Sequence, residues 1–134
     1  MVERTQLASG LEISRILTGL WQIADMEREG NFMNPEEGAL EMRRYVDAGL
    51  TTFDMADHYG TSELIAGQYE ADWPGSGELL TKWVPKPGIV AREKTRVAVE
   101  LALERMDREQ IDLLQFHAWS YSDPGWLDCM FCLQ

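Results

Sequence analysis

The stretch TTFDMADHYGTSE, residues 51–63, decides which fold this sequence predicts. Its first residues are rich in β-formers and lead directly to Asp54, which predicts a strand that ends in a carboxylate. An irregular segment then contains His58 and Tyr59, and residues 60–63 predict a turn into a helix. In parallel α/β proteins the carboxyl ends of the strands hold the catalytic groups, because the loops there can vary without disturbing the core. The stretch therefore predicts a reaction centre where a strand passes into a helix.

The length and charge of the chain limit what it can be. Its 134 residues predict one single domain over residues 1–134, and they are about half of the ~250 residues of a complete eight-fold α/β barrel. A net charge of −11 argues against nucleic acid or an anionic membrane as a partner. No apolar run approaches the ~20 residues of a membrane span, and residues 1–10 do not resemble a secretory or transit peptide. We therefore expect a cytoplasmic protein that binds neither nucleic acid nor a membrane.

Strand and helix patterns alternate on both sides of the stretch. A Ser-Gly turn predicts a hairpin, Asn34 followed by Pro35 and two acids predicts a capped helix start, and Gly49 predicts the end of that helix. The predicted elements are a hairpin at 6–13, strands at 15–19, 50–54, 79–84 and 111–117, helices at 34–49, 62–69, 90–107 and from 123 onward, and a break at 73–77. The long loop at 20–33 contains Trp21 and is predicted to belong to a site. This order predicts a parallel sheet with right-handed crossovers.

The helix predicted at 90–107 has a clear apolar face. The residues on that face are Val90, Val97, Leu101 and Ala102. Their helical spacing predicts an amphipathic helix.

Cys129 and Cys132 allow two interpretations. Their Cys-x-x-Cys spacing is compatible with a redox dithiol or with half of a zinc site. A structural zinc site needs four ligands, however, and the sequence has no second cysteine pair. Because both residues lie in a predicted helix, we favour the interpretation in which a small buried cysteine is part of the core.

Polar side chains follow the ends of successive predicted strands. They are Asp54, Tyr59, Lys82 and His117. Parallel strands bring these ends to one edge of the sheet, so we expect the groups to meet. A phenol is a weak acid with a reference pKa near ~10, and a neighbouring lysine cation stabilises its anion, which eases proton release. A carboxylate keeps the lysine charged, and an imidazole can orient a substrate oxygen. Such a set is suited to protonating a carbonyl oxygen while another group delivers a hydride.

The same corner also allows a metal interpretation. The possible ligands are Asp54, Asp57, His58 and His117. No local His-x-x-x-His pair is present, and Lys82 in the same corner would repel a cation, so we predict no metal site. We expect His58 to point away from the site, because its neighbour Tyr59 takes the inward position.

Several motifs together resemble the aldo-keto reductase family. They are Asp54-x-Ala56-x-x-Tyr59-Gly60-x-Ser62-Glu63, Thr81-Lys82 at a strand end, Leu114-Gln115-Phe116-His117, and Thr18-Gly19-Leu20-Trp21 after the hairpin. The likeness covers nearly the whole chain. That family has a parallel (β/α)₈ barrel of the TIM type, so the resemblance implies a truncated, half barrel with an N-terminal hairpin and about four βα units.

The resemblance also implies roles for individual residues. Tyr59 would be the general acid, tuned by Lys82 and Asp54, and His117 would orient a small aldehyde or ketone. NADPH would donate the hydride, although most of its binding site would lie in the other half of the barrel. The residues near the nicotinamide would be Gly19, Leu20, Trp21 and Asp54. The candidates for the substrate wall would be Trp21, Trp83 and Trp119.

These features support three hypotheses. The first is a truncated NADP-dependent oxidoreductase that reduces aldehydes or ketones. The second is a non-catalytic interaction or regulatory module, because the open edges of a half barrel invite pairing with a second copy or a full-length relative. The third, a regulator that binds NADPH without catalysis, is the least favoured, because most of the cofactor clamp belongs to the other half of the barrel.

Overall fold

The computed structural model describes residues 2–24, 33–88, 92–122 and 124–134, in which strands and helices alternate as predicted. The strands are β1 (Arg4–Ala8), β2 (Leu11–Ser14), β3 (Thr18–Gly19), β4 (Thr52–Asp54), β5 (Glu78–Trp83) and β6 (Leu113–Phe116). The helices are α1 (Pro35–Asp47), α2 (Ser62–Asp72), α3 (Arg92–Arg105) and α4 (Gly125–Cys132). Strands β1 and β2 form an antiparallel hairpin, and β3, β4, β5 and β6 form a parallel sheet in that order. The predictions of a hairpin and a parallel sheet are therefore confirmed.

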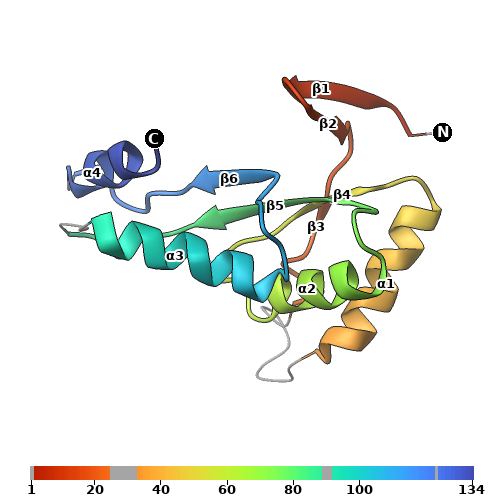
Figure 1. Ribbon diagram of the computed structural model, residues 1–134. Coiled ribbons are helices and arrows are strands. Elements are labelled where there is room, and N and C mark those ends of the chain that lie inside the picture. Colours follow the sequence, from red (N-terminus) through yellow and green to blue (C-terminus); the bar gives the residue numbers. More distant parts are fainter. Residues whose placement is uncertain (1, 25–32, 89–91, 123) are drawn as a thin grey trace.

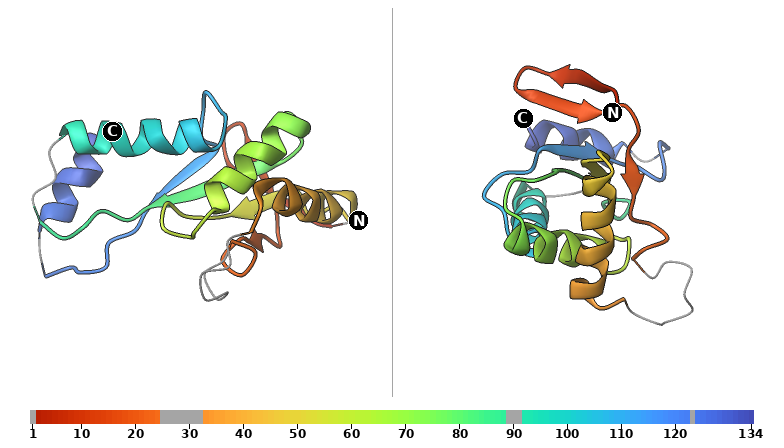
Figure 2. Two further views of the ribbon diagram at one scale, coloured as in Figure 1. Left: turned by 90° about the horizontal axis from the view of Figure 1, so that it is seen from below. Right: turned by 90° about the vertical axis from the view of Figure 1, so that its right-hand side faces the viewer.

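The helices and the hairpin lie on different sides of the sheet. Helices α1, α2 and α3 lie along one face, and α4 lies beyond the C-terminal ends of β5 and β6 (Figure 1). The hairpin lies at the opposite end, away from α1 and α2 (Figure 2). This arrangement leaves the C-terminal ends of the strands together at one edge.

Helix α1 begins and ends where local chemistry favours it. The side chain of Asn34 accepts a hydrogen bond from the backbone N–H of Glu36 at 2.8 Å, and Pro35 occupies the first helical position. Beyond the other end, Gly49 has a φ of 90°, a left-handed conformation that glycine adopts without steric cost. The predicted capped start and glycine stop are both confirmed.

The side chains of the sheet divide between two faces, because successive residues of a strand point in opposite directions. On the helix side, Phe53 and Leu79 pack with Ile65 of α2 in the main core cluster. Farther along the same face, Trp83 packs with Cys129 of α4 in a second cluster. The apolar side chains of the sheet thus support the helices, and the opposite face can hold polar groups.

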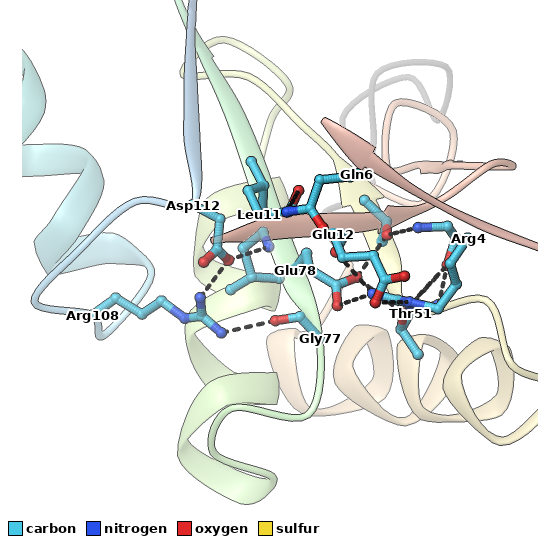
Figure 3. Close-up of polar contacts among 12 residues, drawn as sticks. Arg4, Gln6, Leu11, Glu12, Thr51, Gly77, Glu78, Arg108 and Asp112 are labelled. Carbon is cyan, nitrogen blue, oxygen red and sulfur yellow. Dashed lines mark hydrogen bonds and ion pairs between the residues drawn. The ribbon is translucent and has the colours of Figure 1, made fainter. Parts of the chain in front are cut away.

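Charged side chains fasten the hairpin to the N-terminal ends of the strands (Figure 3). Arg4 of β1 donates to Glu78 at 2.7 Å and to the hydroxyl of Thr51 at 2.5 Å. Glu78 accepts further hydrogen bonds from the hydroxyls of Thr51 (2.9 Å) and Thr52 (2.7 Å). The hairpin is therefore anchored to the starts of β4 and β5 by one shared carboxylate.

A second network at the same end is centred on Arg108 (Figure 3). Its guanidinium group donates to Asp112 at 2.5 Å, to Glu70 at 2.7 Å and to the carbonyl of Gly77 at 2.9 Å. Asp112 in turn accepts the backbone N–H of Leu79 at 2.7 Å. We call the networks around Arg4 and Arg108 the N-terminal rim.

The strand predicted at 15–19 is shorter than expected. Only Thr18–Gly19 pairs with β4, and Ile16 and Leu17 are 64% and 39% exposed. The backbone N–H of Arg15 bonds to the carbonyl of Glu3 at 2.9 Å. The segment therefore still pairs with the hairpin before it reaches the sheet, so the prediction of a buried strand at 15–17 is wrong.

The predicted apolar face of α3 is also partly wrong. Val97 and Leu101 are 48% and 39% exposed, whereas Ala102 and Thr95 are buried. Val97 and Leu101 line an open cleft of about 420 Å³ beside β5, so this part of α3 does not pack tightly on the sheet. Val90 lies outside the described residues.

Candidate active site

The site is built around an ion pair between two neighbouring strands. Asp54 ends β4, and Lys82 lies near the end of the parallel strand β5. The Nζ atom of Lys82 donates to Asp54 Oδ2 at 2.6 Å and to the backbone carbonyl of Met55 at 3.0 Å. The side chains of Lys82 and Asp54 are 14% and 28% exposed, so the pair is partly shielded from water. Its mutual attraction therefore exceeds that of a fully exposed pair.

Tyr59 lies against this ion pair, in the loop between β4 and α2. The Nζ atom of Lys82 is 4.9 Å from the centre of the phenol ring, and the ring of Trp21 packs edge-on at 4.7 Å. Ala56 fixes the loop, because its carbonyl accepts the N–H of Tyr59 (3.0 Å) and the hydroxyl of Ser62 (3.2 Å). Within the described residues the Tyr59 hydroxyl has no hydrogen-bond partner. The hydroxyl is therefore available to a ligand.

His58 also faces the site, so the expectation that it points away is wrong. Its ring lies edge-on to that of Tyr59 at 4.8 Å and to that of Trp119 at 6.1 Å. Its Nδ1 atom is 3.0 Å from Asp57 Oδ1, and Asp57 Oδ2 accepts the backbone N–H of Val84 at 3.1 Å. The prediction assumed that neighbouring side chains point in opposite directions, which holds in a strand but not in an irregular loop.

His117 joins the same group of rings through Trp119. Its backbone N–H bonds to the carbonyl of Trp83 at 2.9 Å, which places it directly after β6. Its imidazole stacks on Trp119 with ring centres 5.1 Å apart and an interplanar angle of 22°. The connected rings are those of Trp21, His58, Tyr59, His117 and Trp119, which we call the aromatic wall.

The predicted neighbours of a nicotinamide lie at this edge, with one exception. Gly19 pairs with Asp54, and a side chain added at Gly19 would meet no atom within 4 Å, so the space beside it is open. Trp21, two residues after Gly19, contacts the ring of Tyr59 and so also lies at this edge. Leu20, by contrast, is fully buried in the main core, and its backbone N–H and carbonyl are bonded to Asp54 and Ala24. The space beside Gly19 is therefore open, whereas that beside Leu20 is filled by the core.

Trp83 lies away from this site. It is 8% exposed, packs with Cys129, and has its ring centre 5.8 Å from that of Phe116. Lys82 precedes it in β5 and faces Asp54, and successive residues of a strand point in opposite directions. Trp83 therefore packs against α3 and α4 and does not belong to the predicted substrate wall.

Gln115 is a site residue that the sequence analysis did not single out. It pairs with Lys82 across β5 and β6, and its Nε2 atom donates to Asp54 Oδ1 at 2.9 Å. The signal was a polar residue inside an apolar strand, two positions before His117 and so on the same face.

Cys129 has the environment expected of a core residue, whereas Cys132 is only partly buried. Cys129 is fully buried in the second cluster, and its thiol donates to the carbonyl of Gly125 at 3.5 Å. Burial raises the pKa of the Cys129 thiol, which is the opposite of what a reactive redox cysteine needs. Among the residues that the structure describes, no group of three or more His, Cys, Asp or Glu side chains is placed to hold a metal ion. In the same part of the chain, no helix has both the length and the apolar character needed to cross a membrane.

Comparisons with known proteins place this geometry in a family. The model of the Aldo/keto reductase family matches residues 15–134. The uncharacterized oxidoreductase YcsN of Bacillus subtilis (strain 168) is 34% identical over 134 aligned residues, which cover 87% of this chain and 43% of the relative. A 6-dehydroglucose reductase of Agrobacterium fabrum is 32% identical with the same coverage of both chains.

A solved structure shows the same fold. The crystal structure of a Bombyx mori aldo-keto reductase in complex with NADP has a TM-score of 0.73 at 20% identity, and the match covers 99% of this chain and 46% of that chain. The chain thus spans less than half the length of the relatives it matches, and its parallel sheet with helices corresponds to half of a TIM-type barrel, as predicted. The chain belongs to the Aldo/keto reductase family.

Proposed function

We propose that this chain provides the proton-donating groups of a site that reduces a small aldehyde or ketone with NADPH. The observation that carries the proposal is the position of Lys82, 2.6 Å from Asp54 and 4.9 Å from the centre of the Tyr59 ring. The similarity to an oxidoreductase and to a 6-dehydroglucose reductase supports a carbonyl substrate. The NADP in the Bombyx mori structure supports the choice of cofactor.

In this proposal Tyr59 donates a proton to the carbonyl oxygen of the substrate. Its hydroxyl is free to approach that oxygen, and the Lys82 cation beside it stabilises the phenolate that remains. Asp54 keeps Lys82 charged and in place, because a lone cation in a partly buried site is costly. The proposed role of His117 and His58, both in contact with Trp119, is to orient the substrate oxygen by hydrogen bonding.

The nicotinamide end of the cofactor would lie in the open space beside Gly19, Trp21 and Tyr59. When bound, NADPH supplies the hydride that the carbonyl carbon takes up while its oxygen takes up the proton. The residues of this chain contribute the proton, the charge that stabilises its donor, and the aromatic surface around the substrate.

A turnover assay tests the proposal. The purified chain is mixed with NADPH and either a reactive aldehyde or 6-dehydroglucose, and the loss of NADPH absorbance is followed. We expect Tyr59→Phe to slow turnover by at least about 100-fold, because it removes the general acid.

Tyr45→Phe is the matched control, because Tyr45 is exposed on α1, outside the aromatic wall. It should leave the rate unchanged. Turnover that survives Tyr59→Phe would exclude Tyr59 as the proton donor, and a wild-type chain that neither binds nor consumes NADPH would rule out catalysis by this chain alone.

The exposed edge of the sheet favours a second candidate function, an interaction module that pairs with a second copy or with a full-length relative. Strand β6 is an edge of the described sheet, and all four of its residues are only partly buried although three of them are apolar. Such an edge favours pairing with another strand. A dimer on size-exclusion chromatography that Leu113→Lys converts to a monomer would support this function, and a concentration-independent monomer would exclude self-pairing.

A further inference from the structure

Gln115 holds the one carboxylate oxygen of Asp54 that Lys82 leaves open. Its neighbours in β6, Leu114 and Phe116, pack in the second core cluster on the helix side, so Gln115 points to the opposite face. There its Nε2 atom donates to Asp54 Oδ1 at 2.9 Å, while Lys82 Nζ donates to Oδ2 at 2.6 Å.

Two donors, one on each oxygen, restrict the rotation of this carboxylate. If Asp54 turned about its side-chain bonds, it would lose at least one of these hydrogen bonds. Lys82 is restrained in the same way, because its Nζ atom also bonds to the carbonyl of Met55 at 3.0 Å. The position of the ammonium group at 4.9 Å from the Tyr59 ring centre therefore depends on a chain of contacts that starts at Gln115.

The amide group of Gln115 suits this position because it donates without bearing a charge. A lysine or arginine would compete with Lys82 for Asp54, and a glutamate would repel Asp54 and attract Lys82 to itself. A neutral donor strengthens the Asp54–Lys82 geometry and adds no further cation beside the phenol.

From these contacts we propose that Gln115 is a positioning residue, which acts through Asp54 to hold Lys82 against Tyr59. This inference rests on the proposed function for its effect on turnover. The geometric part, that Gln115 controls the pairing of Lys82, can be measured without catalysis.

The chain contains only three lysines, Lys82, Lys86 and Lys94, which makes amine labelling a direct test. Brief acylation of the folded chain followed by mass spectrometry of peptides measures how often each amine is unpaired. In the wild-type chain Lys82 should be protected relative to the exposed Lys86 and Lys94. Gln115→Met keeps the size of the side chain and removes the donor, so labelling of Lys82 should rise by about ten-fold, because a hydrogen bond to a charged group is lost. Labelling of the other two lysines should not change.

A matched control and a double variant make the test specific. Gln68→Met removes a comparable hydrogen bond, to Asp72 on the exposed surface of α2, and should leave the labelling of Lys82 unchanged. In an Asp54→Asn background, Gln115→Met should have no further effect, because Gln115 acts through the carboxylate. Gln115→Leu, which also removes the donor and adds no charge, should raise the labelling as well and serves if the Met variant does not fold.

The outcomes separate this inference from the proposed function. If the wild-type chain turns over substrate, Gln115→Met should lower kcat with little change in KM and alter the pH profile of kcat. If neither the wild-type chain nor any variant turns over substrate, the proposed function fails. The labelling result still tests whether Gln115 positions Lys82. Unchanged labelling of Lys82 in Gln115→Met and Gln115→Leu, or a full effect in the Asp54→Asn background, would overturn the inference.

Discussion

The two ends of the sheet hold their charged side chains in different ways. At the N-terminal rim, Arg108 reaches two carboxylates and a backbone carbonyl, and Asp112 also accepts a backbone N–H. At the other end lie Asp54, Tyr59, Lys82, Gln115 and His117, which we call the C-terminal rim. There Lys82 has one carboxylate and one carbonyl as partners, and the Tyr59 hydroxyl has none within the described residues.

This difference indicates that one rim mainly stabilises the fold and the other mainly interacts with a ligand. Charged groups that pair with several partners inside the protein stabilise the fold and have little left to offer a ligand. Groups with open hydrogen-bonding positions contribute less to stability and can interact with a substrate. Substitutions at the N-terminal rim should therefore lower the free energy of unfolding, and those at the C-terminal rim should mainly alter the chemistry.

Arg108→Met should have the largest effect on stability. It leaves the carboxylates of Asp112 and Glu70 without their cation in a place where they are 25% and 15% exposed, which should lower the free energy of unfolding by about 4 kcal/mol. Urea denaturation followed by circular dichroism measures the change. Arg44→Met, which removes an exposed pair with Glu41 on α1, should change it by less than about 1 kcal/mol. Equal effects of the two variants would show that the Arg108 network stabilises the fold no more than an exposed ion pair does.

The variants Trp83→Ala and Trp119→Ala should distinguish a tryptophan of the core from a tryptophan of the aromatic wall. Trp83 is 8% exposed in the second cluster, so its truncation should lower the free energy of unfolding by about 3 kcal/mol. Trp119 is 65% exposed, so the same substitution there should cost less than about 0.5 kcal/mol and should act on substrate binding. A large loss of stability in Trp119→Ala would show that the aromatic wall is part of the core.

Arg4→Met should detach the hairpin from the sheet. The hydrogen bond with Glu78 stabilises the charged form of the Arg4 guanidinium and so raises its pKa. Loss of the hydrogen bonds to Glu78 and Thr51 should lower the free energy of unfolding by about 2 kcal/mol. Amide hydrogen exchange should show faster exchange in β1 and β2 than in β5. Unchanged exchange in the hairpin would mean that backbone contacts alone hold it.

Replacing the central ion pair should have only a small effect on stability. The double variant Asp54→Asn with Lys82→Met removes both charges together, so neither remains uncompensated, and the free energy of unfolding should stay within about 1 kcal/mol of the wild-type value. Turnover, where the wild-type chain shows it, should be lost. A loss of stability as large as that of Arg108→Met would contradict the contrast between the two rims.

Local patterns predicted most of the elements but fewer of their contacts. The capped start of α1, the hairpin and the alternation of strands and helices depend on neighbouring residues, and all were predicted. The exposed Ile16 and Leu17 were missed because apolar character alone does not show whether a segment reaches the sheet. The place of Trp83 could have been predicted from its position next to Lys82, because strand residues alternate between two faces.

The sequence by itself determined the order of the elements and the meeting of Asp54, Tyr59 and Lys82 at one edge, because strand ends in a parallel sheet lie together whatever the details of packing. Only the tertiary structure decided that Gln115 bonds to Asp54, since the two are 61 residues apart and meet only through the register of β4, β5 and β6. It also decided that His58 joins the aromatic wall, because an irregular loop has no fixed alternation. Helix starts, turns and strand ends depend on short spans of sequence, whereas these contacts depend on the packing of strands that are distant in the chain.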